Sequence, residues 1–269
     1  MSRLVLALRD APDRRLDLSV LAPARLAGLE TRAIERLALT PGARPISVGD
    51  VFSVSGTPGE TVCLEGSSSH FDAVGCGLDA GTLIVEGDVG AFAASAMRAG
   101  RLDIRGNAGH GLAAGMNGGL VTVAGGAGDG VGAPRIGERF GMAGGLLVVA
   151  GNVGARAGDR MRRGTILVKG RCAEAAGSRM MGGTIRAEHG FGTSAGALMR
   201  RGTLIAPRID DALPTFADCG RHDLVALRLI DRFLAAQLGP LAPPPLPASV
   251  RKLMGDLATI GKGEILLTA

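Results

Sequence analysis

Six arginines in the second half of the chain are the residues best suited to bind a ligand. Arg160 and Arg179 lie 19 residues apart, and this interval recurs through the middle of the chain. A guanidinium group offers a rigid fork of donors that matches a carboxylate, so the cluster predicts a site for a carboxylate-rich partner. The alternative is a solvated edge, since charged runs usually face water. The candidates are Arg160, Arg162, Arg163, Arg179, Arg200 and Arg201.

A serine motif is a weaker candidate for chemistry. The segment GTSAG, residues 192–196, matches the G-x-S-x-G motif of many hydrolases. That motif requires a strand, a sharp turn and a helix, together with histidine and acid partners. Another short strand pattern follows here, so we expect Ser194 to lie in a turn without a catalytic role. The overlapping GFGTSA, residues 190–195, lacks the crossover helix of a dinucleotide-binding site.

The histidines and cysteines are too scattered to predict a metal site. No two histidines are four residues apart, and no two cysteines form a C-x-x-C pair. Reduced thiols of this kind are typical of a cytoplasmic protein. We therefore assign no catalytic residue, no metal and no cofactor to this chain. The residues considered are His70, His110, His189, His222, Cys63, Cys76, Cys172 and Cys219.

The composition narrows the class of protein. Of 269 residues, 44 are glycine and 46% are hydrophobic, but tryptophan and tyrosine are absent, so small aliphatic side chains must build the core. A formal net charge of +5 favours an acidic partner. Nucleic acid is a poor candidate because aromatic residues that stack on bases are lacking. We expect no membrane partner, since no apolar run reaches the roughly 18 residues of a span.

A repeat of 19 residues organises the middle of the chain. Its anchor is a glycine that follows a methionine or leucine by three residues and precedes a short alternating strand pattern. Successive anchors are 19, 19, 26, 19, 19 and 19 residues apart, so residues 133–139 form an insertion in one turn. The anchors are Gly81, Gly100, Gly119, Gly145, Gly164, Gly183 and Gly202.

This repeat predicts a mainly β fold, a parallel β-helix. Nineteen residues leave no room for a helix, so each unit forms one coil whose strand pairs with its equivalent in the next coil. Parallel crossovers are almost always right-handed, so we expect a right-handed β-helix of about seven to eight coils. Glycines supply corners with positive φ and keep the facing walls close together. The methionines from Met97 to Met199 predict a further buried column.

We divide the chain into three parts. Residues 1–56 form an N-terminal cap with a short helix at 31–39, and residues 57–208 form the β-helix. In the C-terminal part, residues 209–269, the apolar pattern of 222–238 predicts a helix, and the proline-rich 240–247 predicts an extended segment. We expect this helix to cover the outward aliphatic column of the strands, with a partner subunit as the alternative cover.

The glycine-rich coils resemble those of known proteins. The likeness includes the G-x2-M-x2-G units and the segments RFGMAGGLLVV (139–149), MRRGTI (161–166), LPTFADCG (213–220) and GDLATIGKGEILL (255–267). The coils resemble the last domain of the glutamate synthase large subunit. Over nearly the whole chain the sequence resembles the C subunit of formylmethanofuran dehydrogenase, and in particular the C subunit of the bacterial formyltransferase/hydrolase complex.

The resemblance implies a non-catalytic scaffold subunit. The chemistry would lie on formyltransferase-like and amidohydrolase-like partners, which release formate from a formylated methanofuran-type carrier during one-carbon (formaldehyde) oxidation. The resemblance also implies a polyglutamate tail on that carrier. The six arginines would either hold this tail or dock an acidic face of another subunit. Two alternatives stay open. One is the C subunit of a molybdenum or tungsten formylmethanofuran dehydrogenase, and the other is an independent β-helix enzyme with a site near residues 133–139.

Overall fold

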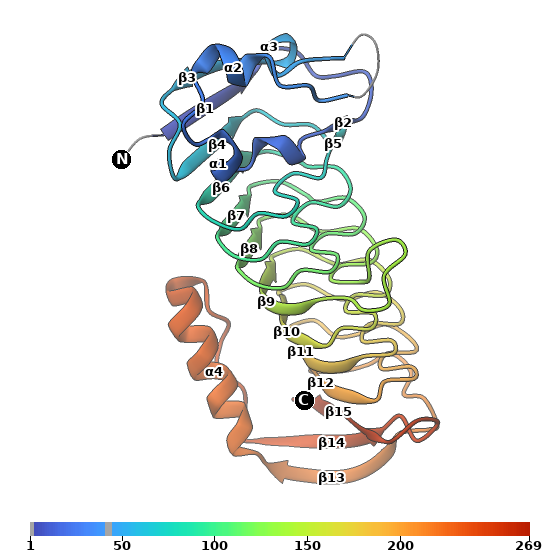
Figure 1. The fold of residues 1–269 in the computed structure, drawn as a ribbon. Coiled ribbons are helices and arrows are strands. Elements are labelled where there is room, and N and C mark those ends of the chain that lie inside the picture. Colours follow the sequence, from blue (N-terminus) through green and yellow to red (C-terminus); the bar gives the residue numbers. More distant parts are fainter. Residues whose placement is uncertain (1–2, 41–44) are drawn as a thin grey trace.

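The chain forms a long stack of coils that is closed by different structures at its two ends (Figure 1). The computed structural model describes residues 3–40 and 45–269. One sheet runs the length of the stack. Its strands are β1 (Arg3–Leu8), β3 (Phe52–Gly56), β4 (Thr61–Glu65), β6 (Thr82–Glu86), β7 (Arg101–Ile104), β8 (Leu120–Val123), β9 (Ala143–Val149), β10 (Arg163–Val168), β11 (Met181–Ala187), β12 (Arg201–Ala206), β13 (Ala217–Asp223), β14 (Ser249–Gly255) and β15 (Lys262–Leu267).

The strands of successive coils pair in parallel from β4 to β12 and stay in register, except for shifts near the starts of the β9–β10 and β11–β12 pairings. Equivalent residues of neighbouring coils face one another, so their inward side chains form one continuous buried column. This confirms the predicted mainly β, parallel fold, whereas the handedness and the number of coils stay predictions. The column contains Leu83, Leu102, Val121, Leu147, Ile166, Ile185 and Leu204.

A second, thinner ladder forms the opposite wall of the stack. Each coil contributes a single residue, and these residues bridge in parallel from one coil to the next. Cys172 lies in this ladder, and its complete burial raises the pKa of the thiol to about 12. Between the two ladders, the methionines from Met97 to Met199 are buried beneath the turns, as predicted. The second ladder runs through Val89, Ala108, Ala127, Val153, Cys172, Phe191 and Ile209.

Glycine is needed in the coils for two different reasons. The anchor Gly164 has a φ of +98°, a left-handed conformation that glycine adopts without strain. Gly170, which closes the same strand, has no positive φ, but a Cβ there would lie 2.4 Å from Oδ1 of Asn152 and 2.6 Å from the carbonyl oxygen of Gly151. The anchor therefore shapes the corner, and the closing glycine lets neighbouring coils approach.

The N-terminal residues close one end of the stack. Strand β1 pairs in parallel with β4 and antiparallel with β3. The predicted helix at 31–39 is too long, because the chain turns back after α2 and the N–H of Leu39 donates to the carbonyl of Ile46 at 2.7 Å. The short elements here are β2 (Leu16–Asp17), η1 (Ser19–Leu21), α1 (Pro23–Leu26), α2 (Thr31–Glu35), α3 (Val48–Val51) and β5 (Phe71–Asp72).

The C-terminal residues return to close the other end. Strand β15 pairs in parallel with β12, and β14 and β13 continue the sheet antiparallel beyond it. The predicted start of the helix at residue 222 is wrong, since α4 spans Val225–Leu238. His222 and Asp223 instead pair with β14 as the end of β13. After α4 come η2 (Gly239–Leu241) and residues 242–247, which have no regular structure.

Helix α4 covers part of the outward face of the sheet, as predicted. Its buried Leu234 and Leu238 pack against Leu167 of β10 and its neighbours in β9. Arg186 of β11 is buried beneath the helix, where it pairs with Asp231 of α4 at 3.3 Å. The chain therefore buries this strip of its own strands under its own helix.

Candidate functional site: an arginine corner

The structure gathers four of the six predicted arginines where the turn of each coil enters its strand. Arg160 and Arg179 occupy the same turn position in successive coils. The backbone N–H of Arg160 donates to the carbonyl of Ser178 at 2.9 Å, and that of Arg179 donates to the carbonyl of Ala197 at 2.7 Å, each in the following coil. Both line a groove of about 410 Å³. We call five residues on and beside this groove the arginine corner: Arg139, Arg160, Arg162, Arg179 and Arg200.

The other two predicted arginines border this corner. Arg163 and Arg201 are exposed at the starts of β10 and β12, and neither lines the groove. Arg201 lies opposite Met181, a residue of the groove lining, in the parallel pairing of β11 with β12. They therefore extend the positive surface along the stack without entering the groove.

Among the described residues, just one member of the corner has a carboxylate partner. Arg179 donates from Nε to Oδ1 of Asp159 at 3.0 Å and from Nη2 to Oδ2 at 3.1 Å. Ser178 also donates to this carboxylate at 3.1 Å. Within residues 3–40 and 45–269, Arg160, Arg162 and Arg200 form no ion pair. Arg139 forms none there either, so four guanidinium groups of the corner remain available to bind an anion.

An aromatic ring, missed by the sequence prediction, fixes two of these cations. The Cζ atom of Arg162 lies 4.7 Å from the centroid of the Phe140 ring, and that of Arg139 lies 5.2 Å from it. Such cation–π contacts hold a guanidinium without neutralising its charge. Phe140 also lines the groove, together with Met181 and Leu198, so the site combines cations with an apolar floor. The available signal was the RFG tripeptide at residues 139–141, which begins at the last residue of the insertion.

Large side chains at the arginine corner adopt a left-handed backbone conformation. Arg160, Arg179 and Leu198 form one column with φ of +51°, +53° and +57°. The same turn position holds Gly77, Ala96 and Gly115 in other coils, and Ala96 also has a positive φ, of +54°. A left-handed conformation costs a residue with a Cβ about 1 kcal/mol or more. Large side chains at these positions therefore oppose folding, which points to a role outside the fold.

The insertion at 133–139 forms the wall of a second groove of about 430 Å³ that shares Arg160 and Arg179 with the first. Three carboxylates line this second groove, and each forms an ion pair or accepts a hydrogen bond. Asp159 holds Arg179, Glu138 pairs with Arg135 at 3.1 Å, and Asp129 accepts the N–H of Ala155 at 2.8 Å. His110 lines the same groove, where its ring packs edge to face against Phe92.

The other candidate residues are not brought together. Ser194 lies in a turn with a φ of +58°, and the next element is strand β12 instead of a helix, so this part of the chain does not form a nucleophile elbow. His70 lies beside Ser68, whereas His222 contacts the carbonyl of Cys219. Among the described residues, no group of three or more histidine, cysteine or acidic side chains is placed to hold a metal.

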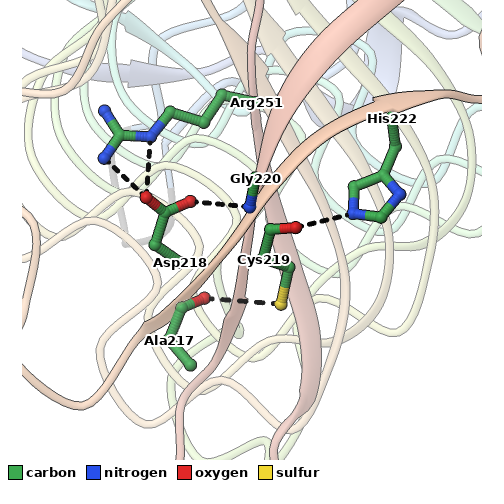
Figure 2. A network of polar contacts seen from close by, with 6 residues as sticks. All are labelled: Ala217, Asp218, Cys219, Gly220, His222 and Arg251. Carbon is green, nitrogen blue, oxygen red and sulfur yellow. Dashed lines mark hydrogen bonds and ion pairs between the residues drawn. The ribbon is translucent and has the colours of Figure 1, made fainter.

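A small polar network fixes the edge strand β13 (Figure 2). Arg251 of β14 donates from Nη2 to Oδ2 of Asp218 at 2.7 Å, and the N–H of Gly220 donates to the other oxygen at 2.9 Å. The hydrogen bond from Arg251 lowers the pKa of the Asp218 carboxyl group. The pairing of β13 with β14 shifts register between Asp218 and Arg221. The network therefore stabilises an irregularity in the strand that ends the sheet.

Comparison with known proteins identifies the family. No family model matches the chain. A segment of 85 residues is 40% identical to the C subunit of the formyltransferase/hydrolase complex Fhc of Methylorubrum extorquens, and this match spans 32% of this chain and 32% of that protein. The crystal structure of the formyltransferase/hydrolase complex (FhcABCD) of the same organism, in complex with methylofuran, contains a chain that is 39% identical, with a TM-score of 0.93. That match covers 98% of this chain and 99% of the other.

None of the helices in the described residues has the length and apolarity needed to cross a membrane. The structural match extends over the coils, both end structures and the arginine corner, because it leaves only 2% of the chain uncovered. The chain belongs to the family of the C subunit of the formyltransferase/hydrolase complex.

Proposed function

We propose that the chain is the scaffold subunit of a formyltransferase/hydrolase complex and is not itself catalytic. The observation that carries this proposal is the match over 98% of the chain to a subunit of the FhcABCD complex. As the sequence resemblance implies, formyltransferase-like and amidohydrolase-like partners would transfer the formyl group of a methanofuran-type carrier and release formate. A cytoplasmic location fits this role. The match favours this assembly over a molybdenum or tungsten formylmethanofuran dehydrogenase.

The chemistry of the grooves supports a role in binding. The carboxylates that line them are engaged with arginines or backbone N–H groups, whereas the exposed guanidinium groups are mostly unpaired. General acid–base catalysis requires a group that can exchange a proton near neutral pH, and an arginine remains protonated there. The arginines of this surface are therefore suited to hold anions in place.

We further propose that the arginine corner binds a chain of carboxylates. Arg160 and Arg179 lie one coil apart, about 4.8 Å along the stack at the usual strand spacing. Arg200 follows in the next coil and lines the same groove. Cations repeated along one direction fit a polymer of carboxylates, such as the polyglutamate tail of the carrier, better than a single anion. An acidic face of a partner subunit is the second candidate, because it presents the same chemistry.

The test is to co-express the chain with its companion subunits and to substitute Arg160, Arg162, Arg179 and Arg200 with glutamine. Native mass spectrometry should find companion subunits and carrier with the unaltered chain. The variant complex should lose the carrier, which supports tail binding, or lose a companion, which supports docking. The matched control replaces Arg9, Arg14, Arg32 and Arg36 of the N-terminal cap with glutamine and should change neither. Unchanged assembly and carrier content in the corner variant would show that the corner is merely solvated.

A further inference from the structure

Helix α4 is apolar on two opposite faces, and only one of them is covered by the described residues. Its inner face packs on the sheet through Leu227, Leu234 and Leu238. On the outer face, Val225, Leu229 and Phe233 are 71%, 60% and 46% exposed. Residues four apart lie in line along a helix, so these three form a single stripe. We call Val225, Leu229 and Phe233 the outer stripe.

The outer stripe is larger than scattered surface residues would be. Together the three side chains expose roughly 300 Å² of mostly apolar surface, the scale of the largest patch on a typical monomer, which is often functional. A helix in water normally has one apolar face and one polar face. Figure 1 shows α4 on the outside of the stack, so no further element of the described chain lies over it. The outer face thus has the character of a buried one.

Two cations run beside this stripe. Arg228 and Arg232 are exposed, lie four residues apart on α4 and form no ion pair among the described residues. Asp231, the only acidic residue within α4, faces inward, where it binds Arg186 and accepts the N–H of Leu246 at 2.8 Å. Like charges four apart destabilise a helix by a few tenths of a kcal/mol. The arginine row therefore has no acidic counterpart among the described residues.

We propose that the outer stripe docks an amphipathic helix of a companion subunit, whose apolar stripe is bordered by a row of aspartate or glutamate residues. This inference rests on the proposed role as a subunit of a larger complex. Helix α4 has 14 residues and is about 21 Å long, which gives a partner helix almost four turns of contact. The carboxylates of the partner would pair with Arg228 and Arg232, and charge complementarity would set its orientation.

The charges also argue against a second copy of this chain as the occupant. In a two-fold antiparallel pairing of two α4 helices, the row of Arg228 and Arg232 would face its own copy. Like charges at that distance repel each other. An acidic amphipathic helix of a different chain would cover the apolar stripe and would pair with Arg228 and Arg232.

The experiment compares hydrogen exchange in the isolated chain and in the co-expressed complex with its companion subunits. We expect amides of residues 225–238 to exchange at least tenfold more slowly in the complex. Two double variants then separate the contributions, Leu229→Gln with Phe233→Gln and Arg228→Glu with Arg232→Glu. Each should weaken assembly with the companions about 10- to 100-fold, the range of central interface residues. The charge variant should also lose the salt dependence of binding.

Matched controls lie elsewhere on the surface. Arg32→Glu with Arg36→Glu alters another exposed pair of arginines four residues apart, and Leu257→Gln with Ile260→Gln alters another exposed apolar pair. Neither should change assembly. If the complex forms and residues 225–238 exchange as fast as in the isolated chain, the inference is wrong while the proposed function stands. If the unaltered chain fails to assemble, the proposed function fails.

Two other outcomes would overturn the choice of occupant. A dimer of the isolated chain that disappears in the Leu229→Gln, Phe233→Gln variant would assign the stripe to a second copy. Binding of the isolated chain to vesicles of anionic phospholipid, lost in both α4 variants, would assign it to a membrane surface. Sedimentation velocity and vesicle co-sedimentation measure these directly.

Discussion

The buried ion pair between Arg186 and Asp231 should decide whether α4 stays on the sheet. The side chain of Arg186 is 7% exposed, and burial lowers its pKa in spite of the nearby Asp231. It also donates from Nη2 to the carbonyl of Pro244 at 2.5 Å. One side chain of β11 thus holds both the helix and the segment that follows it.

Replacing Arg186 with methionine removes these contacts and leaves the carboxylate of Asp231 largely buried. Breaking a buried pair by removing one partner costs about 3–5 kcal/mol. Because Asp231 keeps the N–H of Leu246 as a donor, we expect the lower limit, about 3 kcal/mol. Replacing both residues, Arg186→Met with Asp231→Leu, should cost only about 1–2 kcal/mol, since no charge is left buried and only backbone hydrogen bonds are lost.

Hydrogen exchange and urea unfolding measure the effect and its location. Since coils in a repeat stack contact mainly their neighbours, we expect faster exchange in residues 225–247 while β6 to β8 keep their protection. The reasoning is refuted if the single Arg186→Met variant loses less than about 1 kcal/mol, or if the double variant is no more stable than the single one. Uniform loss of protection across all coils would refute the claim that the pair acts locally.

Three further predictions concern the coils. Gly170→Ala should destabilise the stack by about 2 kcal/mol or more, because its Cβ would overlap the preceding coil. Gly137 has open space around it, so Gly137→Ala should cost only about 1 kcal/mol, for its positive φ alone. Urea unfolding of the two variants measures the difference. A thiol reagent should modify exposed Cys219 at once and buried Cys172 only after unfolding. Burial raises the pKa of Cys172 from 9.0 to about 12 in the folded chain, so the contribution of this thiol to the free energy of unfolding is full below about pH 9 and is lost as the pH rises towards 12. The Cys172→Val variant should not show this loss. Arg160→Gly should raise the free energy of unfolding by about 0.5–1 kcal/mol, as strain at φ +51° is released, while it weakens carboxylate binding in a titration with polyglutamate.

The coils were well predicted because their signal is local and repeated. Each strand of the stack follows an anchor glycine at a fixed interval, so the register of Leu83, Ile166 and Leu204 could be counted directly. The end structures have no such repetition. Strand β15 pairs with β12 across some 60 residues, and its Gly263 lies opposite the anchor Gly202. The glycine pattern of a coil recurs in β15, but the interval of 19 residues does not, so counting along the chain did not place it.

The arginine corner shows the same limit at the level of side chains. Arg160 and Arg179 were predicted to stack because they share a phase of the 19-residue repeat. Arg139 and Phe140 were missed because the insertion interrupts that phase, so counting could not place them beside Arg162. The left-handed φ of the turn residues was also beyond prediction, since arginine and leucine rarely adopt it.

The two proposed surfaces are coupled by the strands between them. In β10, Arg163 borders the arginine corner and Leu167 packs under α4. Four residues of strand separate them, about 13 Å at the usual rise. From Thr165 to Val168 the strand is held in register by both neighbours, and Arg163 pairs with Ala143 of β9 across a register shift. Ladder hydrogen bonds therefore limit how far this separation can vary. The coils would therefore hold a partner helix on α4 and a carboxylate chain at the arginine corner at a nearly constant distance from each other, as a scaffold subunit must.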